Sequence, residues 1–184
     1  MGRFEVIYAD PPWKYADRGC NGAAEFHYPT MPLEKICRLP IQKLAAENSV
    51  LFLWATYPML REALEVISAW GFRYKSIAFQ WVKTYKPKAD GTAQPFFGLG
   101  RWTRGNTEPC LLATRGRPKR IANDVGQLIL DPAEELLVAP VTRHSAKPPE
   151  TRDRIVRLMG DVPRLELFAR ERVLGWDAWG NELP

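Results

Sequence analysis

Cysteine and histidine are scarce in this sequence of 184 residues. It contains three cysteines, Cys20, Cys37 and Cys110, and two histidines, His27 and His144. The cysteines are odd in number and far apart, so they predict neither a disulfide framework nor, with only two histidines to help, a zinc cluster. Three free thiols are typical of a protein of the reducing cytosol, and we expect no metal.

Long apolar segments are missing too. The longest apolar run, near Val50 to Ala55, is much too short to span a bilayer. The amino terminus has no basic stretch followed by an apolar one, so no secretory signal is expected. Met1-Gly2 begins a myristoylation pattern, but Val6 stands where that pattern requires Ser or Thr. These absences predict a cytoplasmic protein with no membrane partner.

The glycine-rich turn that most nucleotide-binding folds place after their first strand is also absent. Gly98-Leu-Gly100 does not replace it, because no strand leads into this segment and the third glycine is misplaced. Hydrophobic residues make up 46% and charged residues 26% of the chain, which predicts a single globular domain over residues 1–184. The net charge of +5 permits a nucleic-acid partner without requiring one.

The sequence does contain an apolar run, Phe4 to Ala9, that leads into Asp10-Pro11-Pro12-Trp13. Six residues rich in β-branched and aromatic types, followed by two prolines, predict a buried strand that ends in a loop. Proline keeps the residue before it extended, so Asp10 should lie at the carboxyl end of that strand. In open α/β sheets, ligands bind at this end of the strands.

The Asp-Pro-Pro-Trp segment offers hydrogen-bond acceptors beside an indole ring. Pro11 and Pro12 have no N–H, so the Asp10 carboxylate and the backbone carbonyls dominate the turn. Such acceptors suit a flat ring that carries an NH2 group, with Trp13 against the ring face. Accepting the amine hydrogens as the nitrogen pyramidalises restores its lone pair for attack. The alternative is an ordinary strand-ending turn with a core tryptophan.

The remaining sequence alternates helical and strand patterns. Further strands are predicted over Ser49 to Thr56, Phe72 to Lys83, Glu108 to Ala113, Glu134 to Val141 and Arg164 to Phe168. Helices are predicted over Leu33 to Ala46 with a break at Pro40, from Pro58 to Gly71, and over Pro149 to Met159. Residues 14–31 and Lys83 to Thr107 lack periodicity and are predicted as loops. This order predicts an α/β fold with a doubly wound sheet.

Two segments combine cations in a way that suits nucleic acid. The loop from Lys83 to Thr107 interleaves cations with aromatic side chains, which suits phosphates and unstacked bases and points to Trp102 and Arg104. The run Arg115-Gly-Arg117-Pro-Lys119-Arg120 places four cations in six residues. A solvated surface is the alternative interpretation of both segments.

The motifs, taken in order, resemble one family. The Asp-Pro-Pro-Trp motif is followed by Tyr28-Pro-Thr30-Met31, Leu51-Phe-Leu-Trp54, Trp81-Val-Lys83, Asn106-Thr-Glu108-Pro-Cys110, His144-Ser-Ala-Lys147-Pro148, Leu165-Glu-Leu-Phe168-Ala-Arg170 and Gly180-Asn181. Over nearly the whole chain, this order and approximate spacing resemble the MT-A-seventy family of S-adenosylmethionine-dependent N6-adenine methyltransferases. The resemblance implies a Rossmann-like methyltransferase sheet with a permuted motif order, in which the catalytic motif precedes the cofactor strand.

The resemblance also implies roles for individual residues. The catalytic motif would be Asp10, Pro11, Pro12 and Trp13. The cofactor S-adenosylmethionine would be held by Asp10, Lys147, Phe168, Arg170, Asn181 and Glu182, with Lys147 on the methionine carboxylate and Asn181 on the ribose hydroxyls. The alternatives are a surface lysine at Lys147, a strand-end ion pair at Arg170 and a terminal cap at Asn181. The substrate adenine and its strand would be held by Trp13, Tyr28, Trp102, Arg104, Asn106 and Glu108.

Some positions depart from the family pattern. Arg172 and Val173 stand where eukaryotic members carry a His-Asn pair, and Glu182 stands for a glutamine. Only nine residues precede Asp10, so we expect no counterpart of the upstream segment that helps to bind the cofactor's adenine in eukaryotic members. That pocket is expected elsewhere, with Asn123 to Leu128 as a candidate.

The activity implied by the resemblance is methyl transfer to the exocyclic N6 amine of adenine in nucleic acid. A short chain without a separate recognition domain is similar to the compact bacterial and phage members, which favours DNA over RNA. The alternatives are a catalytically silent nucleic-acid-binding subunit, an RNA adenosine methyltransferase and a small-molecule amine methyltransferase. Assembly into a homodimer or heterodimer stays open.

Overall fold

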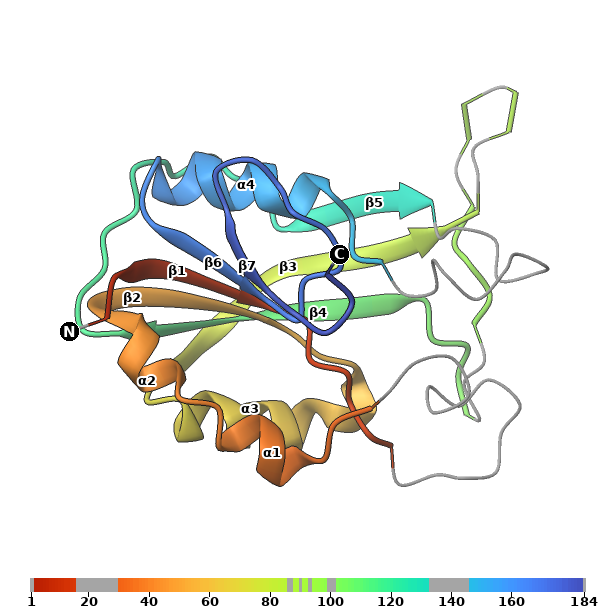
Figure 1. Cartoon of the computed structure of the whole chain (residues 1–184). Helices are drawn as coiled ribbons and strands as arrows, with labels where there is room; N and C mark the ends of the chain where they lie inside the picture. The colour runs from red at the N-terminus through yellow and green to blue at the C-terminus, as the bar shows by residue number, and fades with distance from the viewer. Residues whose placement is uncertain are drawn as a thin grey trace.

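A twisted sheet forms the centre of the molecule. The computed structural model describes residues 2–15, 30–85, 88–89, 91–92, 94–98, 102–132 and 146–183. Over these residues the sheet has seven strands in the order β5-β3-β4-β2-β1-β6-β7. Helices α1 and α3 lie on one side of it and α4 lies on the other (Figure 1). Helices on both faces are what a doubly wound sheet requires, so this predicted fold class is confirmed.

The bounds of the elements are as follows. The strands are β1 (Phe4–Ala9), β2 (Ala45–Trp54), β3 (Arg73–Thr84), β4 (Thr107–Arg115), β5 (Leu128–Pro132), β6 (Arg164–Leu167) and β7 (Asp177–Trp179). The helices are α1 (Leu33–Cys37), α2 (Ile41–Leu44), α3 (Leu60–Ala69) and α4 (Glu150–Met159), and the 3₁₀ turn η2 (Tyr57–Met59) precedes α3.

Strand β4 runs against the direction of its neighbours. It pairs antiparallel with β2 and with β3, whereas β1 pairs parallel with β2 and β6, β3 with β5, and β6 with β7. The amino end of β4 therefore lies at the same edge of the sheet as the carboxyl ends of the other strands. This arrangement brings residues at the start of β4 next to residues that follow β1 and β2.

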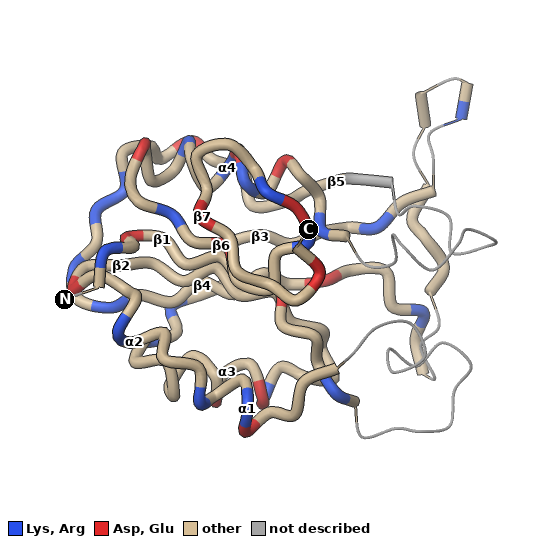
Figure 2. The backbone as a smooth tube through the Cα atoms, in the orientation of Figure 1, with Lys and Arg blue, Asp and Glu red and all other residues tan. Residues whose placement is uncertain are grey.

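Both faces of the central strands are buried. Ile7 and Leu51 pack in the apolar cluster beneath α1 and α3, and Val6 and Phe52 pack in the cluster beneath α4. A strand buried on both faces is apolar at successive positions instead of alternating, as β1 is in its last four residues. Among the described residues, the charged ones lie mostly on the helices, on the connections and at the two ends of the sheet (Figure 2).

Most of the predicted elements are confirmed. Strand β1 and helix α4 lie where the sequence predicts them, and the chain breaks between α1 and α2 at Pro40. Strand β2 begins at Ala45, earlier than the predicted Ser49, and takes residues assigned to the preceding helix. The short strands β5 and β7 are not predicted by the sequence. The predicted strand Glu134 to Val141 and most of the predicted loop 14–31 lie outside the described residues.

Within the described part of the chain, two further kinds of feature are absent. No helix there is long and apolar enough to cross a membrane. No group of three or more His, Cys, Asp or Glu side chains comes together there in a way that would hold a metal ion.

Candidate functional site

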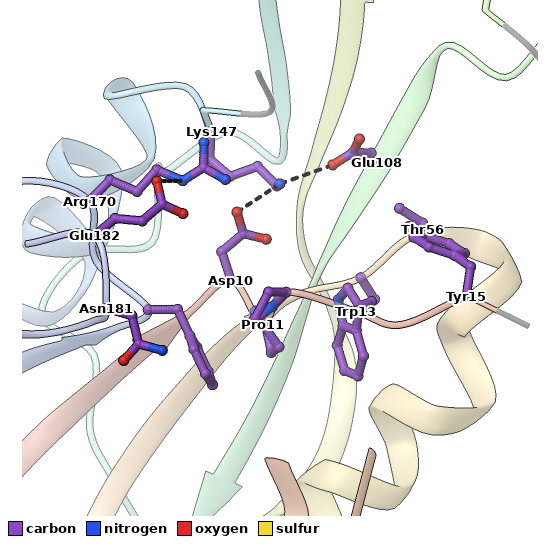
Figure 3. Close-up of a pocket in the computed structure, with 13 residues that line it drawn as sticks. Asp10, Pro11, Trp13, Tyr15, Thr56, Glu108, Lys147, Arg170, Asn181 and Glu182 are labelled. Carbon is purple, nitrogen blue, oxygen red and sulfur yellow. Dashed lines mark hydrogen bonds and ion pairs between the residues drawn. The ribbon is translucent and has the colours of Figure 1, made fainter. Parts of the chain in front are cut away.

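A pocket opens at the edge of the sheet where β1, β2 and β6 end and β4 begins (Figure 3). Its lining residues come from both ends of the chain and from its middle: Asp10, Pro11, Pro12, Trp13, Tyr15, Ala55, Thr56, Glu108, Lys147, Phe168, Arg170, Asn181 and Glu182. The fold therefore brings the Asp-Pro-Pro-Trp motif together with all the other residues that the resemblance assigns to the cofactor.

Asp10 follows β1 directly and lines this pocket. Its carboxylate Oδ2 accepts a hydrogen bond from Lys147 Nζ at 2.9 Å, and 26% of the Asp10 side chain stays exposed. Burial raises the pKa of the Asp10 carboxyl, and the nearby Lys147 ammonium opposes that rise without cancelling it. The carboxylate is thus held by one lysine and is still accessible from the pocket.

The other residues of the motif make more hydrogen bonds within the protein than the sequence predicts. The carbonyl of Pro11 accepts from the Trp13 N–H at 2.9 Å, and that of Pro12 accepts from the Met31 N–H at 2.8 Å. A carbonyl oxygen has two lone pairs, so one such bond does not exhaust the acceptor capacity of either carbonyl. The Trp13 side chain is buried, and its Nε1 donates to the Trp54 carbonyl at 3.2 Å. Trp13 therefore belongs to the core and presents only part of its surface to the pocket.

Glu108 supplies a second carboxylate on the far side of Lys147 (Figure 3). One of its oxygens lies 3.4 Å from Lys147 Nζ, and the other lies 2.5 Å from Lys83 Nζ. Burial alone would raise the pKa of Glu108, but Lys147 and Lys83 together lower it below its usual value. Glu108 is therefore ionised under ordinary conditions and shared between two lysines.

The opposite wall of the pocket is formed after β6 and β7. Phe168 has a positive φ of 61°, and its ring packs edge-on against Trp179 with 5.5 Å between centroids. Arg170 Nε lies 3.6 Å from the Glu182 carboxylate. This wall combines an aromatic ring with a cation and a carboxylate.

Gly180 allows the end of β7 to approach the segment after β6. A Cβ at this position would lie 2.2 Å from the carbonyl oxygen of Ala169 and 2.6 Å from its nitrogen. Only glycine fits such a close backbone approach. The contact places the next residues, Asn181 and Glu182, in the pocket wall.

Three of the predicted substrate contacts do not line the pocket. Trp102 and Arg104 are exposed on the connection that precedes β4, and the Arg104 guanidinium lies 5.2 Å from the centroid of the Phe97 ring. Asn106 is on the same connection, and its carbonyl accepts from the Lys83 N–H at 2.7 Å. These residues lie near the pocket edge of the sheet, outside the pocket itself. Tyr28 lies outside the described residues.

The cationic run that begins at Arg115 lies far from the pocket. Arg115 is the last residue of β4 and pairs with Ser49 in the middle of β2, whereas the pocket lies past the end of β2 and at the start of β4. A contact between this run and nucleic acid stays a prediction, and it would occur at the opposite edge of the sheet. The candidate adenine segment Asn123 to Leu128 does not line the pocket either.

Tyr15 and Thr56 line the pocket, and the sequence does not single them out. The Tyr15 hydroxyl and Thr56 Oγ1 are 2.8 Å apart and share a hydrogen bond. The position of Thr56 just after β2, the neighbour of β1, is a usable signal, because the carboxyl ends of parallel strands meet at one edge. Tyr15 has no comparable sequence signal.

Comparison with known proteins gives matches over nearly the whole chain. A family model described as MT-A70 matches residues 4–182. The chain is 32% identical over 203 residues to a "Type II methyltransferase M.MunI" of Mycoplasma sp, with 99% of this chain and 78% of that protein covered. It is 31% identical to "N(6)-adenosine-methyltransferase MT-A70-like" of Arabidopsis thaliana. It is 30% identical to "N(6)-adenosine-methyltransferase catalytic subunit METTL3" of Homo sapiens. All of this chain matches these two, but it spans only 24% and 29% of their lengths.

Proposed function

Since this chain belongs to the MT-A70 family, we propose that it transfers a methyl group from S-adenosylmethionine to the N6 amine of adenine in nucleic acid. One observation carries the proposal. The Asp10 carboxylate is accessible in a pocket that also contains Lys147, Arg170 and Asn181. The relatives support the same reaction, because their names describe methyltransferases, and two of the names specify N6-adenosine.

The substrate side of the pocket is built to accept hydrogens. Asp10 accepts an N–H of the adenine amine, and the second lone pair of the Pro11 carbonyl accepts the other. Accepting these hydrogens stabilises the pyramidal nitrogen that forms as the amine attacks, more than it stabilises the flat ground state. Asp10 need not be a strong base, because the product ammonium is acidic enough to lose its proton to water.

The remaining lining residues fit S-adenosylmethionine. Lys147 and Arg170 offer cations to its methionine carboxylate, and Asp10 offers a carboxylate to its ammonium. Asn181 and Glu182 offer hydrogen-bond acceptors to the ribose hydroxyls. When bound, this cofactor supplies a methyl group activated by a positively charged sulfur.

We infer DNA as the polymer in preference to RNA. The chain covers 78% of the bacterial relative but less than a third of the two N6-adenosine methyltransferases named above. The alignment therefore accounts for most of the bacterial protein and for only a part of the other two. In a duplex the target adenine must leave the base stack to reach a pocket of this kind.

The test is transfer of a radiolabelled methyl group from S-adenosylmethionine to matched single-stranded and duplex DNA and RNA oligomers, followed by nucleoside analysis. The expected product is N6-methyladenine, formed in DNA faster than in RNA. Faster methylation of RNA would reverse the choice of polymer. Binding of oligomers without any transfer would instead indicate a silent subunit.

A further inference from the structure

Four side chains of alternating charge form a continuous row from the end of β3 into the pocket. Lys83 Nζ lies 2.5 Å from a Glu108 oxygen, the other Glu108 oxygen lies 3.4 Å from Lys147 Nζ, and Lys147 Nζ lies 2.9 Å from Asp10. The two inner members are the most buried, with 11% of the Glu108 side chain and 9% of the Lys147 side chain exposed. The row thus links a residue outside the pocket to Asp10.

Aromatic rings wall this row and strengthen its electrostatics. Lys83 Nζ lies 4.8 Å from the centroid of the Trp81 ring, and Lys147 Nζ lies 5.7 Å from that of Trp54. Charges that are partly withdrawn from water interact more strongly than surface charges do. A change of charge at one end of the row should therefore alter the electrostatic environment of the residue at the other end.

Glu108 determines how the charge of Lys147 is shared. Each Glu108 oxygen has its own lysine, and Lys147 lies closer to Asp10 than to Glu108. If Lys83 is neutralised, the buried Glu108 carboxylate must be compensated by Lys147, since an uncompensated buried charge is costly. Lys147 Nζ then moves toward Glu108 and away from Asp10.

We propose that Lys83 is a positioning residue, which holds Glu108 so that Lys147 stays directed at Asp10. The sequence assigns Lys83 to a group of phosphate-binding cations, but only 22% of its side chain is exposed and its ammonium contacts Glu108. The expected effect of Lys83 on activity rests on the methyltransferase function proposed above. The expected effect of Lys83 on the ionisation of Asp10 does not depend on that function.

The ionisation of Asp10 is a direct measure of this arrangement. The titratable and charged groups that face Asp10 are Lys147, Glu108, Arg170, Cys110, Tyr8 and Tyr15. Of these groups, Lys147 is the one that hydrogen-bonds to the carboxylate. Withdrawing it removes a contribution that favours the ionised form, so Asp10 should bind its proton at higher pH.

The experiment compares Lys83→Met, Lys83→Arg and the control Lys75→Met with the wild type. Lys75 is exposed on the same strand, so its substitution removes the same charge outside the row. Lys83→Met should lower kcat roughly 10- to 100-fold by misplacing the reacting groups, with KM for the oligomer unchanged within about twofold. The acid limb of its pH profile should move to higher pH. Lys83→Arg should restore both properties, and Lys75→Met should match the wild type.

A double-mutant cycle tests whether Lys83 acts through Glu108. In a Glu108→Gln background, Lys83→Met should change kcat by less than about twofold, because the residue it positions has lost its charge. A raised KM with unchanged kcat and a weaker salt dependence would overturn the inference and make Lys83 a phosphate contact. Equal effects of Lys83→Met in both backgrounds would also overturn it.

A titration of Asp10 by NMR in the ligand-free protein separates this inference from the proposed function. Lys83→Met should raise the pKa of Asp10 relative to the wild type and to Lys75→Met, and Lys83→Arg should not. An unchanged titration in Lys83→Met overturns the positioning role even where methyl transfer is present. If the wild type methylates none of the oligomers, the proposed function fails while the titration still decides the role of Lys83.

Discussion

Asp10 is a carboxylate in a buried setting that still reaches a pocket. Its backbone is kept extended by the prolines that follow it, and one of its oxygens is held by Lys147. These constraints leave few orientations for the side chain, so little conformational freedom would remain to be lost on binding the proposed substrate amine. The role of Asp10 can be tested directly by mutation.

Replacing Asp10 with alanine should abolish measurable methyl transfer, a loss of at least roughly 100-fold, because the acceptor for the amine hydrogens is gone. Binding of S-adenosylmethionine, measured by calorimetry, should weaken much less, since Lys147, Arg170 and Asn181 remain. Asp153→Ala, at an exposed position on α4, is the matched control. Retained transfer in Asp10→Ala would refute the assigned role.

The pH dependence of the reaction should report Asp10. The carboxylate accepts the amine hydrogens best when it is ionised, because it then carries a negative charge and no proton of its own. Burial raises the pKa of this group. The acid limb of kcat/KM should therefore fall at a pH above the ordinary aspartate value of about 3.9. An acid limb at or below that value in the wild type would contradict this assignment.

The same raised pKa has a consequence for stability. The folded protein binds the Asp10 proton more tightly than the unfolded chain, so this group lowers the free energy of unfolding as pH rises through the interval between the two pKa values. Denaturant titrations across this interval should show that fall in the wild type, and Asp10→Asn should not show it.

Which residues gather at the site is partly predictable from sequence. Asp10, Lys147 and Arg170 belong to ordered motifs, and the structure brings them into one pocket. The pairing of Lys83 with Glu108 is not predictable in this way. It depends on the end of β3 lying beside the start of β4, which local sequence patterns do not encode.

Among the elements, α4 is attached to the sheet by a buried ion pair. Arg152 on α4 donates from Nε to one oxygen of Glu166 at 2.8 Å and from a terminal nitrogen to the other at 2.9 Å. Glu166 is on β6, the strand that leads to the pocket wall containing Phe168 and Arg170. The two hydrogen bonds of this bidentate pair attract α4 to β6 and also fix the orientation of the helix relative to that strand.

Replacing Arg152 with alanine should lower the free energy of unfolding by roughly 3–5 kcal/mol, because the Glu166 carboxylate would be left buried without its partner. Arg157→Ala provides a control on the same helix. Its exposed pair with Asp124 should contribute no more than about 1 kcal/mol. Urea denaturation measures both variants, and equal losses would show that burial of the Arg152 pair is not the cause.

The sequence predicts the type of an element better than it predicts the direction of a strand. It does not predict the two outermost strands of the sheet. Strands β1 and β2 contain continuous apolar runs, and β3 has Ile77, Phe79 and Trp81 at alternate positions, so all three can be predicted from their residues. The reversed direction of β4 depends on pairing with distant residues, so its apolar pattern does not reveal it. Strands β5 and β7 are short and lie at the two edges of the sheet, where few positions are buried.

Across the whole molecule, the positive charge is spread over both ends of the sheet (Figure 2). The net charge of +5 therefore does not by itself identify the surface that nucleic acid contacts. Arg104 is exposed near the end of the sheet that carries the pocket. Arg73 is exposed at the other end of the strands, where β3 begins. Comparing these two arginines tests which edge binds the phosphate backbone.

Arg104→Ala should weaken oligomer binding about equally for all sequences and reduce the slope of log K against log salt by about one, the signature of one lost phosphate contact. Arg73→Ala should leave the slope unchanged. Fluorescence anisotropy at several salt concentrations measures both slopes. A larger effect of Arg73→Ala would place the backbone on the opposite edge.

The reversed strand β4 also affects how the family can diversify. Because β3 ends and β4 begins at the pocket edge, the chain from Tyr85 to Asn106 leaves the sheet and returns to it on the same side. Doubling the length of such an excursion costs only about 0.6 kcal/mol in closure entropy. The length of this connection can therefore change during evolution at little cost to stability, while the sheet and the helices beneath it stay intact.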